Sequence, residues 1–159
     1  MPPPAGTRAP PGVVVITPPH PGFSAYAGPN SFVSMSRLRP GSLLISQPFL
    51  GDPNFERTVV LLCSHSEEEG SFGLVLNRPA TLQLGDVLEL PAGVPFAAAA
   101  LPLGIGGPVQ PDTLHYLHQH AELPQAVALG QDVYWGGDFR QLLEQLLTGT
   151  VAPVTVRLY

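Results

Sequence analysis

Apolar runs separated by short polar segments predict several strands in the first half of the chain. Thr58–Cys63 (TVVLLC) is continuously apolar and rich in β-branched residues, which is typical of a strand buried on both faces. Leu43–Ile45 and Phe72–Leu76 predict two further strands, and we expect the second to end at Asn77-Arg78-Pro79. Asp52-Pro53-Asn54 predicts a turn in which the Asp52 side chain accepts a backbone N–H two residues on.

The clearest helical pattern lies near the C-terminus. Apolar side chains recur there at helical spacing, and Asp138 and Gly149 are placed to begin and end the helix. Leu82–Leu90 predicts a second, shorter helix. We interpret 91–102 as a loop and 104–108 as a glycine turn. The apolar positions of the longer helix are Phe139, Leu142, Leu143, Leu146 and Leu147.

The remaining periodic segments predict more strands. They are Thr113–Leu117, Ala126–Leu129, Val133–Trp135 and Val154–Tyr159. Strands therefore outnumber helices, and most of the links between them are short. The sequence predicts a single α+β domain, in which two helices pack on a mixed, largely antiparallel β-sheet.

Composition changes this picture at the N-terminus. Nine of the 20 prolines fall within the first 30 residues. Because proline lacks the amide donor and fixes φ, we expect residues 1–34 to be a disordered or extended tail without a β-ladder or helix. We therefore expect the folded domain to span 35–159, with Met35 as the native start of the protein.

Charge and cysteine content exclude several classes of function. The formal net charge is −5, and all seven basic residues are scattered arginines, which excludes lysine Schiff-base chemistry and argues against direct nucleic-acid binding. Cys63 is the only cysteine, so an intrachain disulfide framework is excluded. No apolar run reaches the length of a membrane span or a signal-peptide core. We expect a cytoplasmic protein with no membrane association.

Four segments, in order, resemble the YqgE/AlgH family of bacterial proteins. The first joins GSLLISQP at 41–48 to DPNFERTVV at 52–60. The others are GLVLNRP at 73–79, GGPV at 106–109 and LHYLH at 114–118. Together the resemblance covers residues 39–159.

This resemblance implies a compact α/β domain in the bacterial cytosol. Family members are labelled transcriptional regulators from a regulatory phenotype, and no cofactor or catalytic residue is established for them. Members usually continue past the last strand into a turn and a further helix. We therefore expect this chain to lack the C-terminal end of the family domain.

Two groups of residues are candidates for chemistry. Cys63 and His65 lie two apart on a predicted strand, so their side chains would point the same way and the imidazole could activate the thiol. His115 and His118 belong to a histidine-rich patch that could hold a metal. We interpret Cys63 as buried packing, and the histidines as a strand end rather than a zinc site, because a strand would turn His115 and His118 to opposite faces.

Polar and glycine residues inside the family-like segments are candidates for binding a ligand or partner. The glycine turn could cradle an anion with its backbone amides, although the helix and lysine of known phosphate loops are absent. The alternative is that all of them serve turns and caps. These candidates are Asp52, Asn54, Arg57, Asn77, Arg78, Gly106 and Gly107.

We interpret the chain as a non-enzymatic regulatory protein of the YqgE/AlgH type that acts through a protein partner. We expect no cofactor and no direct contact with nucleic acid. The alternative is a small-molecule-binding protein, or a hydrolase or redox enzyme that uses Cys63 and His65. The residues leave the partner, the ligand and the oligomeric state open.

Overall fold

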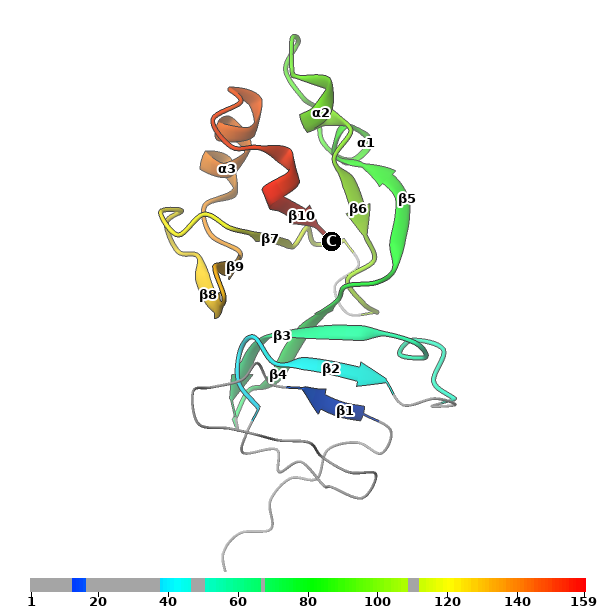
Figure 1. The fold of residues 1–159 in the computed structure, drawn as a ribbon. Helices are drawn as coiled ribbons and strands as arrows, with labels where there is room; N and C mark the ends of the chain where they lie inside the picture. The colour runs from blue at the N-terminus through cyan, green and yellow to red at the C-terminus, as the bar shows by residue number, and fades with distance from the viewer. Residues whose placement is uncertain (1–12, 17–37, 47–50, 67, 109–111) are drawn as a thin grey trace, which may run out of the picture. The chain divides into compact units, whose positions relative to one another are not determined.

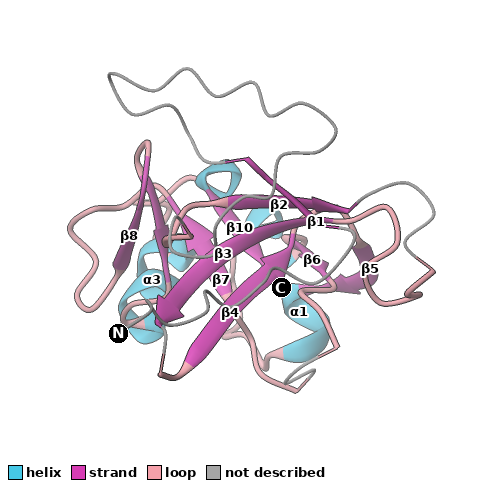
Figure 2. Cartoon of the chain, turned by 90° about the horizontal axis from the view of Figure 1, so that it is seen from below, coloured by secondary structure: helices cyan, strands magenta, loops and turns pink. Residues whose placement is uncertain are grey.

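The computed structural model describes residues 13–16, 38–46, 51–66, 68–108 and 112–159. The chain divides into two compact units, Met1–Gly73 and Leu74–Tyr159. Strands make up most of the regular structure, and the helices are short (Figure 2).

A four-stranded sheet, in the order β1-β2-β3-β4, forms the first unit and the start of the second (Figure 1). Strands β1 and β2 pair antiparallel, as do β2 and β3. The middle of β3 is buried on both faces at Leu61, Leu62 and Cys63, as its continuous apolar run predicts. The strands are β1 (Val13–Ile16), β2 (Leu43–Ser46), β3 (Val59–Ser66) and β4 (Gly70–Val75).

Strand β1 corrects one expectation about the N-terminus. We expected no β-ladder within residues 1–34, yet Val13–Ile16 pairs with β2 in the register Val13↔Ser46 to Ile16↔Leu43. These four residues are apolar, β-branched and free of proline, so each keeps the amide that a ladder needs. The other residues of this stretch, and Met35, lie outside the described part of the chain.

The second unit contains a six-stranded sheet in the order β5-β6-β10-β7-β9-β8. All neighbouring strands pair antiparallel except β6 and β10, which are parallel. The last strand is thus inserted between β6 and β7. The strands are β5 (Pro79–Gln83), β6 (Pro102–Gly104), β7 (Tyr116–His118), β8 (Val127–Gly130), β9 (Val133–Trp135) and β10 (Val156–Leu158).

Helix α3 (Phe139–Leu147) matches its prediction at both ends. The Asp138 side chain accepts a hydrogen bond from Gln141 N at 3.1 Å, and Gly149 has φ +75°, the left-handed conformation that ends many helices. Leu142 and Leu146 are fully buried. The other helices are α1 (Leu84–Val87), α2 (Phe96–Ala99) and the 3₁₀ turn η2 (Pro153–Thr155).

The core of the second unit is built from apolar side chains of α1, α2, α3 and the sheet. Leu84, Ala98, Leu142 and Val156 are each no more than 1% exposed. Because α3 contributes two leucines one turn apart, it is anchored along most of its length. The remaining buried members are Leu101, Tyr116, Leu123, Leu146, Val151 and Leu158.

The prediction of a mixed, largely antiparallel α+β fold is confirmed, with differences in detail. The described residues form two sheets rather than one, and three α-helices rather than two. Strand β5 begins at Pro79, where we expected the preceding strand to stop and no new one to start. Proline is tolerated there because the first residue of a strand can dispense with its N–H. Helix α2 lies in the predicted 91–102 loop, where three alanines favour a helix after Pro95.

Other element boundaries also shift. Strand β6 occupies the end of the predicted loop, and α1 is four residues long rather than spanning Leu82–Leu90. Strand β7 begins at Tyr116 rather than Thr113, and η2 replaces the first part of the last predicted strand. None of the helices within the described ranges is long and apolar enough to cross a membrane.

Candidate functional site

The candidate residues Asp52, Asn54 and Arg57 share one turn before β3. Asp52 Oδ1 accepts a hydrogen bond from Asn54 N at 2.8 Å, and Asp52 O accepts one from Glu56 N at 2.7 Å. The prediction of a side-chain-capped turn is confirmed. Arg57 adopts φ +55°, a left-handed conformation that is uncommon for residues other than glycine. Asp52 therefore shapes the turn that leads into β3.

The candidates Asn77, Arg78, Gly106 and Gly107 lie in the second unit. Arg78 O accepts a hydrogen bond from Ile105 N at 2.7 Å, so Arg78 and the glycine turn lie together. A Cβ at Gly106 would approach Leu74 Cδ2 to 3.0 Å and Tyr159 Cβ to 3.1 Å, whereas one at Gly107 would meet no atom within 4 Å. Gly106 thus makes room for Tyr159, which gives this glycine a packing role.

Cys63 and His65 both lie on β3, but their polar atoms have different neighbours. The Cys63 thiol is fully buried and lies 3.6 Å from Leu61 O. His65 Nδ1 is 2.7 Å from Ser71 Oγ, which comes from β4. The imidazole is therefore engaged across the strand pair. Its use as a base toward Cys63 would require that bond to break.

The histidines of the 115–120 patch fall into two places. His115 packs near Trp135, with ring centroids 6.3 Å apart. His118 is buried at the end of β7, and its ring stacks on those of His120 and Tyr134 at 6.0 and 5.9 Å. Among the residues that the structure describes, no three His, Cys, Asp or Glu side chains are grouped so that they could hold a metal ion.

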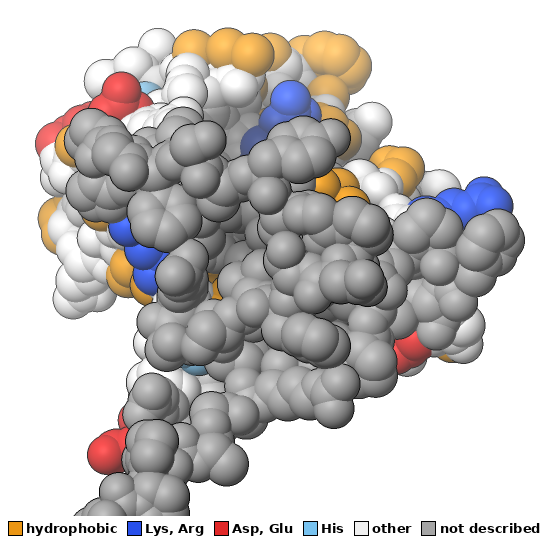
Figure 3. Space-filling model, turned by 60° about the horizontal axis from the view of Figure 1, so that its bottom comes forward, with side chains coloured by type: hydrophobic (Ala, Val, Ile, Leu, Met, Phe, Trp, Pro, Cys, Tyr) orange, Lys and Arg blue, Asp and Glu red, His pale blue; other side chains and the backbone are white. Residues whose placement is uncertain are grey.

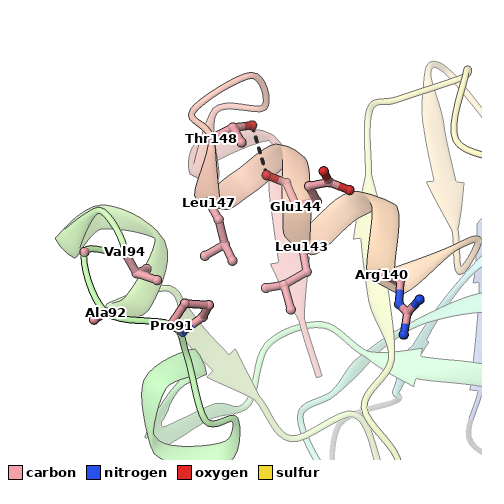
Figure 4. Close-up of a pocket in the computed structure, with 9 residues that line it drawn as sticks. Pro91, Ala92, Val94, Arg140, Leu143, Glu144, Leu147 and Thr148 are labelled. Atoms are coloured by element: carbon pink, nitrogen blue, oxygen red, sulfur yellow. Dashed lines mark hydrogen bonds between the residues drawn. The ribbon is translucent and has the colours of Figure 1, made fainter.

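An apolar groove lies between α3 and the 91–94 loop (Figure 4). Its volume is about 430 Å³. Leu143 and Leu147 point from the helix toward Pro91 and Val94 on the loop. Both leucines are half-buried, in contrast to Leu142 and Leu146 on the core face of the same helix. The groove is also lined by Ala92, Gly93, Arg140, Glu144 and Thr148.

The groove offers few polar groups to a ligand. The Thr148 hydroxyl already donates to Glu144 O at 2.9 Å, within its own helix. Arg140 and Glu144 lie one helical turn apart, and neither side chain forms an ion pair within the described part of the chain. The groove therefore offers a ligand an apolar floor. It also offers one basic and one acidic side chain, Arg140 and Glu144, on α3.

The candidate list from the sequence did not include this groove. A signal was present, because five apolar positions in nine helical residues make a stripe wider than one core-facing row. The sequence gave no sign of the opposite wall of the groove. Residues 91–94 carry no motif, and they lie beside α3 only in the folded chain.

The described arginines lie on separate elements, and each group of blue side chains on the face drawn in Figure 3 is small. The absence of direct nucleic-acid binding remains a prediction. The described arginines are Arg39, Arg57, Arg78, Arg140 and Arg157.

Comparison with known proteins identifies relatives along most of the chain. A family model described as AlgH-like matches residues 43–159. A UPF0301 protein of Chlorobium limicola is 41% identical over 124 residues, which are 77% of this chain and 63% of that protein. A UPF0301 protein of Chlorobaculum tepidum is 42% identical over 123 residues, with the same coverage of both chains.

The solution structure of the AlgH protein from Pseudomonas aeruginosa is also similar. Its TM-score is 0.56 at 33% identity, and the match covers 73% of this chain and 61% of that one. This chain thus spans less than two thirds of the length of these relatives. With its family-like segments, its α+β fold and a family match that runs from β2 to the last residue, the chain belongs to the AlgH-like family.

Proposed function

We propose that this chain is a non-enzymatic regulatory protein that acts on transcription through a protein partner, and that the groove between α3 and Pro91–Val94 binds that partner. The groove is the observation that carries the proposal. Apolar side chains left accessible on a helix beside a loop are a common feature of protein-binding surfaces.

The lining favours a protein segment over a small molecule. Small-molecule sites orient their ligand with a few convergent polar groups. Here the Thr148 hydroxyl is used within α3, and the only other polar side chains are the charged Arg140 and Glu144. We therefore assign the groove to an amphipathic helix of the partner. Its apolar residues would contact Leu143 and Leu147, while an acidic and a basic residue would face Arg140 and Glu144.

Site-specific photo-crosslinking in the native cell tests this proposal. A photoreactive phenylalanine analogue at Leu143 should give one defined crosslinked product, to be identified by mass spectrometry. The matched control places the same residue at Gln141, which does not line the groove. Leu147→Glu should abolish the crosslink and reproduce the transcript changes of a gene deletion, while its thermal unfolding stays near that of the wild type.

Two results would contradict the proposal. The first is equal crosslinking from Leu143 and Gln141. The second is a Leu147→Glu protein that folds normally and leaves both the crosslink and the transcript profile unchanged.

A further inference from the structure

His118 and His120 form a stacked pair, joined by a hydrogen bond that requires the His118 ring to be neutral. Their rings are 6.0 Å apart and inclined by only 14°. His118 ends β7 and is 2% exposed, whereas His120 lies in the following turn with a side chain that is 17% exposed. This pair is independent of whatever occupies the α3 groove.

The contacts of His118 fit only a neutral ring. Its Nε2 lies 2.8 Å from Gly136 O, and because a carbonyl only accepts, Nε2 carries the hydrogen. Its Nδ1 accepts the backbone N–H of His120 at 3.2 Å and so must keep its lone pair. Burial also lowers the pKa of His118, and the nearby His120 adds to this, while Gly136 O and Glu122 act in the opposite direction.

The side chain of His120 joins its turn to η2 and to Glu122. The Thr155 hydroxyl donates to Ala152 O at 2.7 Å, so it accepts from His120 Nε2 at 2.8 Å. The other nitrogen, Nδ1, lies 3.4 Å from the Glu122 carboxylate.

The groups around His118 come from several elements. Tyr116 stacks on His118 from β7, and Tyr134 stacks on it from β9. From β10, Val156 lies opposite His118, and the adjacent Arg157 is exposed. Burial raises the pKa of Tyr116, and the negative charge of Asp138, at the start of α3, raises it further. Glu122 is the carboxylate that contacts the pair.

We propose that His118 is a proton switch at the connection between β7 and η2. A proton taken up by His118 Nδ1 displaces the His120 N–H from that nitrogen. The turn at 119–122 then separates from the end of β7.

Nuclear magnetic resonance of the full chain between pH 8 and 4.5 tests the switch. At pH 7 the ring ¹⁵N shifts should show His118 as the neutral form with hydrogen on Nε2. The His120 amide should lose at least tenfold of its hydrogen-exchange protection between pH 7 and 5, while the Leu142 amide in α3 keeps its own.

His118→Gln supplies a neutral side chain with both a donor and an acceptor, so it should abolish the loss of protection. His65→Gln, in the first unit, is the matched control and should leave it unchanged. The wild-type titration decides the matter even if His118→Gln fails to fold. Hydrogen on His118 Nδ1 at pH 7, or a His120 amide that stays protected at pH 5, would overturn the proposal.

Discussion

The ring of Tyr159 occupies the space that a side chain at Gly104 would need. A Cβ at Gly104 would lie 2.7 Å from Tyr159 Cδ1 and 2.8 Å from Tyr159 Cε1. The tyrosine cannot move away freely, because its N–H and C=O both form 2.8 Å hydrogen bonds with His115. Close approach of β10 to β6 therefore depends on glycine at position 104.

Gly104→Ala should lower the free energy of unfolding by about 1–3 kcal/mol, the usual cost of overpacking a core. Urea denaturation measures this. Tyr159→Ala removes the opposing ring, so the alanine at 104 should cost much less in the Tyr159→Ala background. An equal cost in both backgrounds would show that the contact with Tyr159 is not its cause.

The cap at Asp138 allows a second prediction. Asp138→Ala removes the acceptor for Gln141 N at the first turn of α3, so we expect a loss of about 1 kcal/mol in the free energy of unfolding. Asp138→Asn keeps an accepting oxygen and should retain most of the stability. If both variants unfold at the wild-type urea concentration, the cap contributes little.

Local rules predicted α3 and β3 well because each carries its own signal. The leucine spacing, Asp138 and Gly149 specify α3 without help from the rest of the chain, and the apolar run around Leu62 specifies β3. The glycine segment shows the limit of such rules. Its spacing predicts a tight turn, but it gives no sign that Tyr159, more than 50 residues away, packs on Gly104 and Gly106.

The groove and the division into two sheets were not predictable for a related reason. They depend on which segments meet across long sequence separations. Strand β10 inserts beside β6 through the single register pair Leu158↔Leu103, and no local pattern encodes that parallel pairing. Likewise, Leu143 has the same spacing signal whether it faces the core or a groove. Burial, which separates it from Leu142, is known only once α3 is packed.

The two faces of α3 should respond differently to substitution. Leu146→Ala deletes a side chain that is 1% exposed, so the free energy of unfolding should fall by about 2–5 kcal/mol. Leu147→Ala, one residue further on, removes a half-buried groove side chain and should cost less than half as much as its neighbour. Thermal or urea unfolding of the two variants checks the difference. Equal losses would show that Leu147 belongs to the core.

Stability should fall as the solution becomes acidic. Burial lowers the pKa of His118 and of His115, so the folded chain favours their neutral forms. The unfolded chain binds protons on both below pH 6.5. This stabilisation is therefore complete above pH 6.5 and is lost as the pH falls through the folded-state values.

Urea denaturation at pH 7.5, 6.5 and 5.5 measures this dependence. The midpoint should change little between pH 7.5 and 6.5 and decrease between pH 6.5 and 5.5, and His118→Gln should flatten that decrease. A midpoint that is constant or rises toward pH 5.5 would mean that the buried imidazoles are not protonated on unfolding.

Cys63 gives a direct test of the enzymatic alternative. A nucleophilic cysteine must be accessible and partly ionised, whereas this thiol is fully buried and lies 3.6 Å from Leu61 O. We expect alkylation by iodoacetamide in the native protein to be at least tenfold slower than in urea, because reaction requires the strand to open. Intact-mass spectrometry follows the single modification, and Cys63→Ala, which has no thiol, gives the background. Native alkylation as fast as in urea, and slowed by His65→Gln, would instead support a Cys63–His65 pair and reopen the hydrolase or redox interpretation.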